Sequence, residues 1–101
     1  MKKLVILAAL LPCLAWAETP ADVTIQHFEF GPQAVTVKAG TKVTWVNKDV
    51  EPHTVVSSDH KFQSEALDTG DSFSVIFDKA GRYGYFCTLH PHMTGVVTVL
   101  P

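Results

Sequence analysis

One short segment of the chain gathers three side chains that bind soft metal ions. The run Cys87–Met93 holds a thiolate, an imidazole three residues later at His90, and a thioether three residues after that. Sulfur ligands favour copper, and imidazole binds copper as well. Because Pro91 fixes its own backbone angle and restricts His90, the loop is expected to be stiff. The segment therefore predicts a copper site with Cys87, His90 and Met93 as ligands.

A trigonal blue-copper site needs a second imidazole in the plane of the thiolate, with the methionine as a weak axial ligand. Four histidines could supply it: His27, His53, His60 and His92. We choose His53, because it begins a β-rich run in which a sheet would hold a ligand. His27 and His60 are expected to be ordinary polar residues. His92 is expected to face solvent, with a partner contact or a second, labile metal site as its alternatives.

The composition of the chain excludes several classes of protein. The chain has 101 residues and a formal net charge of −2, and 47% of its residues are hydrophobic. It is too short for two ordinary domains and too apolar for a disordered chain. The charge gives no reason to expect nucleic acid as a partner. No nucleophile–base pair, carboxylate pair or glycine-rich phosphate loop stands out, so we do not expect an enzyme.

The first residues are typical of a secretory signal peptide. Met1–Lys3 is positively charged, Leu4–Trp16 is apolar, and Ala15–Ala17 is a small-x-small cleavage site. We predict that residues 1–17 are removed and that residues 18–101 are exported to the periplasm. A membrane anchor is the alternative, but the apolar run is too short to cross a bilayer. Cys87 is then the only cysteine left, and in an oxidising compartment it must be buried, paired or metal-bound.

The pattern of residues 18–101 predicts one domain made of short β-strands. Apolar and polar residues alternate in runs bounded by Gly, Pro, Asp and Asn. The expected strands cover residues 23–30, 35–38, 43–47, 53–57, 72–77, 82–87 and 97–99. Residues 58–70 have no such pattern and could form a short helical turn. Seven or eight strands at this spacing predict an all-β, two-layer sandwich.

The alternation also predicts which side chains form the core. The inward positions are Val35, Val37, Val43, Trp45, Val55, Phe73, Val75, Phe77, Tyr83, Tyr85, Val97 and Val99. Asn47 falls on the same face as Trp45, and a buried amide needs hydrogen-bond partners. We expect Asn47 to bond to the region of Thr88 and so to tie two ligand loops together.

Four segments together resemble the cupredoxins of the plastocyanin/azurin group, and within that group the amicyanins. They are Val43–Asn47, Pro52–His53, Gly81–Cys87 and Cys87–Met93. The short spacing between His90 and Met93 is the amicyanin-like feature. The resemblance covers nearly all of residues 18–101. It implies a Greek-key β-sandwich with one type 1 copper at one end. The copper ligands that it implies are His53, Cys87, His90 and Met93.

Two residues depart from the family pattern. Thr54 stands where the family commonly has an asparagine that ties the copper loops, so loop rigidity and reduction potential could differ. His92 stands where amicyanins have an aromatic residue, which concerns the partner surface. Neither departure removes a copper ligand.

Three strong ligands and a weak fourth leave no open position for a substrate, whereas catalytic metal sites usually keep one. We therefore expect a soluble, monomeric periplasmic carrier that shuttles single electrons between redox proteins. The alternatives are a periplasmic protein for copper handling or delivery and a metal-free interaction module. The amicyanin likeness implies an amine dehydrogenase as electron donor and a c-type cytochrome as acceptor.

Overall fold

The computed structural model describes residues 20–101, so the predicted signal peptide of residues 1–17 lies outside the described residues. This part of the chain folds into eight strands and no helix. The strands are β1 (Ala21–Gln26), β2 (Glu29–Gly31), β3 (Ala34–Lys38), β4 (Thr41–Asn47), β5 (Val56–Ser57), β6 (Ser72–Phe77), β7 (Gly81–Phe86) and β8 (Thr94–Leu100). No helix within residues 20–101 has the length and apolar character that crossing a membrane requires.

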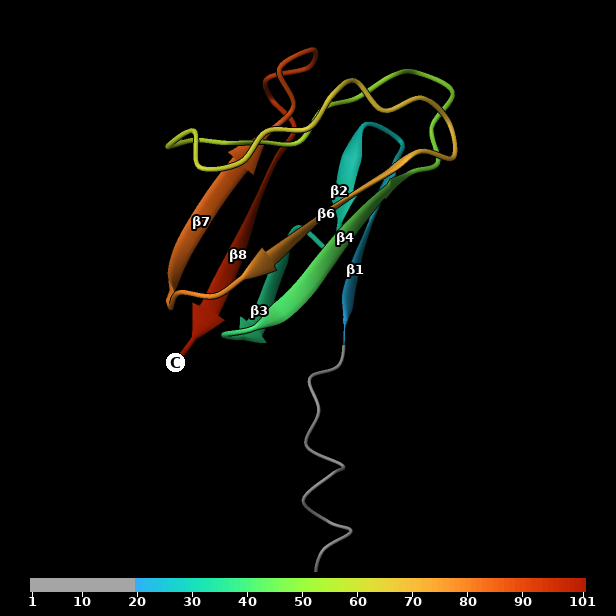
Figure 1. Ribbon diagram of the computed structural model, residues 1–101. Helices are drawn as coiled ribbons and strands as arrows, with labels where there is room; N and C mark the ends of the chain where they lie inside the picture. The colour runs from blue at the N-terminus through green and yellow to red at the C-terminus, as the bar shows by residue number, and fades with distance from the viewer. Residues whose placement is uncertain (1–19) are drawn as a thin grey trace, which may run out of the picture.

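The strands form two four-stranded sheets that pack face to face (Figure 1). One sheet has the order β2-β1-β4-β6 and the other β3-β8-β7-β5. Two pairs of strands distant in sequence run parallel: β1 beside β4, with Val23 opposite Trp45, and β3 beside β8, with Val35 opposite Val97. The remaining pairs are antiparallel. This crossed order confirms the predicted Greek-key β-sandwich.

The core lies between the sheets and is centred on Trp45. The Trp45 ring meets Tyr85 edge-on at 5.2 Å between ring centroids. Seven of the predicted inward residues are buried, namely Val43, Trp45, Val55, Phe77, Tyr85, Val97 and Val99. Val35, Val37, Phe73, Val75 and Tyr83 are partly buried and pack against them. The core also includes residues outside the predicted list, namely Val23, Ile25, Phe30 and Leu67.

Two predicted strands differ from the structure. The strand expected over residues 23–30 is a hairpin of β1 and β2, because His27 and Phe28 both have positive φ and reverse the chain. The strand expected over 53–57 is short, with only Val56–Ser57 in the sheet and His53 in an isolated bridge to Leu67. Residues 58–70 contain no helix.

The buried hydroxyl of Tyr85 leads to a prediction about alkaline pH. Within residues 20–101, the Tyr85 hydroxyl and the Trp45 indole N–H are buried and have no hydrogen-bond partner. Burial raises the pKa of Tyr85 to about 12, although the nearby Trp45 indole lowers it in part. An unfolded tyrosine has a pKa of about 10. Between these values the folded state binds the proton more tightly, so rising pH must reduce stability.

We therefore expect the free energy of unfolding to fall by up to about 2–3 kcal/mol between pH 10 and pH 12 through Tyr85 alone. The Tyr85→Phe variant has no such ionisation. Its free energy of unfolding should therefore rise relative to that of the natural chain across this interval. Urea titrations of both proteins at several pH values measure the difference. A difference that stays constant from pH 9 to pH 12 would contradict this account of Tyr85.

Candidate metal centre

Two loops at one end of the sandwich bring the predicted ligands together. The β4–β5 and β7–β8 connections both lie at the upper end of the molecule in Figure 1. Cys87 directly follows β7, so a sheet strand delivers its sulfur. The loop after it closes through two backbone bonds, from Met93 N–H to the His90 carbonyl (2.9 Å) and from Cys87 N–H to the Met93 carbonyl (3.1 Å). His53 is fixed by paired backbone bonds with Leu67.

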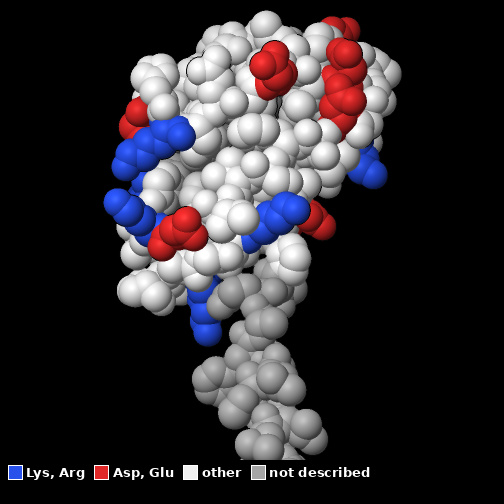
Figure 2. All heavy atoms as spheres, viewed as in Figure 1, with Lys and Arg blue, Asp and Glu red and all other residues white. Residues whose placement is uncertain are grey.

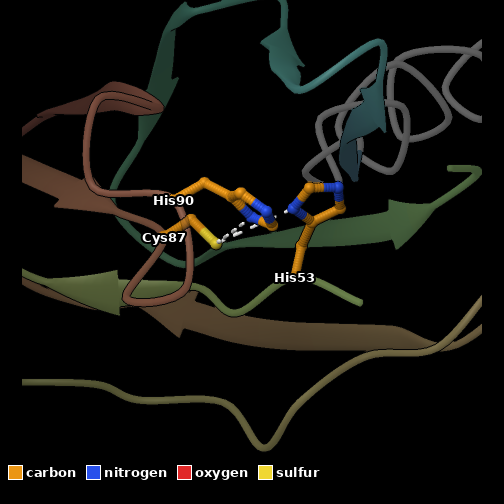
Figure 3. A group of neighbouring side chains, drawn as sticks. All are labelled: His53, Cys87 and His90. Carbon is orange, nitrogen blue, oxygen red and sulfur yellow. Dashed lines mark hydrogen bonds between the residues drawn. The ribbon is translucent and has the colours of Figure 1, made fainter. Parts of the chain in front are cut away.

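The side chains of His53, Cys87 and His90 converge on one point (Figure 3). The Cys87 sulfur lies 3.7 Å from His53 Nδ1 and 3.8 Å from His90 Nδ1. All three donor atoms lie within 4.8 Å of one another. Cys87 and His53 are completely buried, whereas His90 is half-buried at the surface. This is the arrangement of two imidazoles and one thiolate that the sequence predicted.

The spacing of these donors fits a single first-row metal ion. Metal–nitrogen and metal–sulfur bonds of about 2.0–2.3 Å at trigonal angles place sulfur and nitrogen about 3.7 Å apart. The observed separations of 3.7 and 3.8 Å agree with that value. A buried thiol with two imidazole nitrogens is also the donor set that copper prefers. The two separations from the Cys87 sulfur are therefore those that a shared copper ion would require.

Met93 is buried, with 3% of its surface exposed, and its backbone is bonded to both Cys87 and His90. The structure thus places Met93 in the same closed loop, and its role as the weak fourth ligand stays a prediction.

The other three histidines, His27, His60 and His92, are exposed.

Asp49 orients His53, a role that sequence reasoning missed. Asp49 Oδ2 lies 2.8 Å from His53 Nε2. Burial raises the pKa of the Asp49 carboxyl, but hydrogen bonds from the backbone of Phe28 and His27 and from His53 outweigh it, so the pKa lies below its usual value. An ionised carboxylate can only accept, so His53 carries its proton on Nε2 and leaves Nδ1 free toward Cys87. The four-residue spacing between Asp49 and His53 is the only sequence signal that could have indicated this role of Asp49.

Thr54 makes the link between the ligand loops that was predicted for Asn47. Thr88 N–H donates to Thr54 Oγ1 at 2.8 Å, and the two hydroxyls of Thr54 and Thr88 are 2.8 Å apart. Thr54 N–H also points at the Cys87 sulfur, at 3.4 Å. Thr54 therefore fastens the β4–β5 loop to the Cys87 loop and gives the thiolate a hydrogen-bond donor.

The prediction that Asn47 bonds to the Thr88 region was wrong. Its side-chain amide donates to the carbonyls of Leu67 (2.8 Å) and Glu51 (2.9 Å), and its oxygen accepts from Asp49 N–H (2.8 Å). The reason is its place at the end of β4, where it faces its own following loop and the loop before β6. Asn47 thus holds the segment that carries Asp49 and His53.

Replacing Asn47 with alanine should therefore destabilise the fold and loosen the first ligand loop. The Leu67 carbonyl would lose one of its two donors, and the Glu51 carbonyl and the Asp49 N–H would lose the Asn47 side chain as partner, so we expect the free energy of unfolding to fall by about 2–3 kcal/mol. Urea titration of the metal-free protein measures this loss without interference from metal. Thr44→Ala is the control. It removes an exposed hydrogen bond between the Thr44 and Ser74 hydroxyls and should change the free energy of unfolding by less than about 1 kcal/mol. Equal effects would contradict the role given to Asn47.

Comparisons with known proteins agree with this geometry. The family described as "Cupredoxin-like domain" matches residues 3–99. Amicyanin from Paracoccus versutus is 38% identical over 94 residues, which cover 85% of this chain and 71% of that protein. Plastocyanin from Scenedesmus fuscus is 43% identical over 83 residues, covering 69% and 85%. A purple cupredoxin from Nitrosopumilus maritimus superposes with a TM-score of 0.75 at 34% identity, covering 78% of this chain and 98% of that one.

Proposed function

Because the chain belongs to the cupredoxin-like family and its cofactor is one type 1 copper, we propose that it carries single electrons between redox proteins in the periplasm. The copper ligands in this proposal are His53, Cys87, His90 and Met93. When bound, copper supplies a one-electron Cu(II)/Cu(I) couple. The observation that carries the proposal is the convergence of His53, Cys87 and His90 on one buried point.

The surroundings of the three donors suit electron transfer better than catalysis. Rigid loops restrict ligand movement, because Thr54 bonds the two ligand loops to each other and Asp49 fixes the His53 ring. A site that keeps one geometry in both oxidation states needs little reorganisation when an electron moves. Cys87 is completely buried, which excludes solvent from the thiolate.

An apolar surface around His90 supports brief docking of a redox partner. Phe28 and Leu89 are 41% and 49% exposed, and Pro91 beside His90 is exposed as well. Half-buried His90 therefore reaches the surface within an apolar rim, and electrons enter or leave there. The likeness to amicyanin supports an amine dehydrogenase as donor and a c-type cytochrome as acceptor, with this chain acting as a monomer.

Acidic side chains near this end favour a positively charged partner. Figure 2 shows most of the visible Asp and Glu side chains toward the upper end of the molecule. Glu51, Glu65, Asp68 and Asp71 are exposed on the two loops that Asn47 joins. We expect electron transfer to a c-type cytochrome of positive net charge to slow as ionic strength rises, because salt screens the attraction. A rate that is independent of salt from 10 to 300 mM, measured by stopped-flow absorbance, would count against this partner charge.

Repeated redox cycling tests the proposed function against copper handling. The copper-loaded chain is reduced with ascorbate and reoxidised with ferricyanide over many cycles in the presence of a Cu(I) chelator. An electron carrier should recover its full visible absorbance in every cycle and release no copper to the chelator. Loss of copper to the chelator on each reduction would overturn the carrier proposal and favour copper delivery.

A further inference from the structure

The turn between β1 and β2 consists of residue types that disfavour its backbone conformation. His27 and Phe28 have φ values of 56° and 59°. Two-residue hairpin turns of this kind strongly prefer Asn-Gly, because side chains with a Cβ are strained at positive φ. Such strain, of order 1–3 kcal/mol per residue, persists only where the surrounding structure enforces it. A contact elsewhere in the molecule must therefore hold this turn.

That contact is the carboxylate of Asp49. The N–H groups of His27 and Phe28 donate to Asp49 Oδ1 and Oδ2 at 2.7 and 2.9 Å. Asp49 is itself fixed, because its N–H donates to Asn47 and its carbonyl accepts from Thr69 Oγ1 at 2.6 Å. Only 12% of the Asp49 side chain is exposed. The turn is thus fastened to a rigid point on a different loop.

The same carboxylate holds His53, so the turn and the metal site share one anchor. Asp49 Oδ2 accepts from both Phe28 N–H and His53 Nε2. The Phe28 ring then lies edge-on to both imidazoles, with centroid distances of 5.4 Å to His53 and 5.0 Å to His90. Phe28 keeps 41% of its surface exposed, so one ring touches the two imidazoles and the solvent.

We propose that Asp49 is a positioning residue that makes the His27–Phe28 turn a third loop of the metal centre, holding His53 in one tautomer and Phe28 against both imidazoles. This inference rests on the proposed copper site for its redox consequence. The anchor itself is a property of the polypeptide and can be measured without metal. Asp49 sets the electron density on His53, while Phe28 covers the imidazole edges that a partner would otherwise reach directly.

The decisive variant is Asp49→Asn, with Glu51→Gln as a matched control. Both changes remove one negative charge from the same loop. The Glu51 carboxylate is exposed, and within residues 20–101 its side chain makes no hydrogen bond, so it reports the effect of charge alone. Asp49→Asn replaces a charged acceptor of three bonds with a neutral amide, and such charge-assisted bonds are worth about 1.5–3 kcal/mol.

Amide hydrogen exchange in the metal-free protein tests the anchor. In Asp49→Asn we expect the His27 and Phe28 amides to exchange about tenfold faster or more, because their acceptor is weakened. Glu51→Gln should leave both rates unchanged. Equal rates in Asp49→Asn and the natural chain would overturn the anchor.

The reduction potential of the copper-loaded protein tests the consequence for the site. Asp49→Asn should raise the potential more than Glu51→Gln does, because a neutral partner makes His53 a weaker donor to Cu(II). Equal shifts in the two variants would overturn the positioning role. Absence of an intense visible band in the copper-loaded natural chain would instead refute the proposed function. The hydrogen-exchange result would still hold for the metal-free protein.

The Phe28→Gly variant distinguishes a role of the Phe28 ring in the metal centre from a role in stability alone. Glycine relieves the positive φ at position 28 while it keeps the N–H that donates to Asp49. We expect the free energy of unfolding to be kept or raised, while the copper hyperfine splitting in the electron paramagnetic resonance spectrum changes, because the ring against both imidazoles is gone. An unchanged spectrum would show that Phe28 does not belong to the metal centre.

Discussion

Replacing Cys87 with serine should abolish the intense visible band of the copper-loaded protein and its electron exchange. The Cys87 sulfur lies between the two imidazole nitrogens and accepts from Thr54 N–H. A thiolate gives copper a covalent bond and a strong charge-transfer absorption, whereas a serine hydroxyl stays protonated and is a poor ligand for copper. Visible absorption after addition of one equivalent of Cu(II) measures the effect.

A histidine variant outside the cluster is the control for this prediction. His60 is exposed and lies outside the group formed by His53, Cys87 and His90. His60→Ala should therefore keep the band at full intensity. If Cys87→Ser kept the band, or if His60→Ala lost it, the thiolate assignment would be wrong.

Among the six glycines of the chain, Gly95 is the one at which replacement by alanine should cause the largest loss of stability. Gly95 lies opposite Tyr85 in the β7–β8 pair. A Cβ at position 95 would stand 2.4 Å from two atoms of the Tyr85 side chain, which is far inside van der Waals contact. Tyr85 cannot move aside, since Trp45 and Phe30 pack against its ring. We expect the free energy of unfolding to fall by about 2–4 kcal/mol.

Gly84→Ala is the matched control for this prediction. Gly84 lies on the neighbouring strand β7, and a Cβ there would make only an ordinary contact, 3.5 Å from Ser58 Oγ. We expect Gly84→Ala to change stability by less than about 1 kcal/mol. Similar losses in the two variants, measured by urea titration, would show that overlap with Tyr85 does not determine the requirement for glycine.

The candidate metal ligands on one short loop could be identified from the sequence because their chemistry is local. Cys87 and His90 are close in sequence, and the strand before them fixes their direction. His53 was chosen among four histidines for its β-rich neighbourhood, and the structure places it beside Cys87, while its role as a ligand stays a prediction. Alternation also identified most strands, because a sheet with one buried face imposes a period of two.

The residues that surround the ligands could not be predicted, because their roles depend on contacts distant in sequence. Thr54 and Thr88 are 34 positions apart, and Asp49 and His27 are 22 positions apart. No local pattern indicates that either pair meets. The assignment of Asn47 to Thr88 failed for the same reason: burial was predicted correctly, but the partners of a buried amide depend on which loop passes beside it.

Titration of the metal-free chain with Cu(II), followed by visible absorption and electron paramagnetic resonance, tests the ligand assignment most directly. We predict that an intense thiolate-to-copper band grows linearly and stops at one copper per chain, with a narrow parallel hyperfine splitting. A colourless product, or a weak band whose splitting is that of copper bound by nitrogen and oxygen alone, would show that sulfur 87 and imidazoles 53 and 90 do not share one ion.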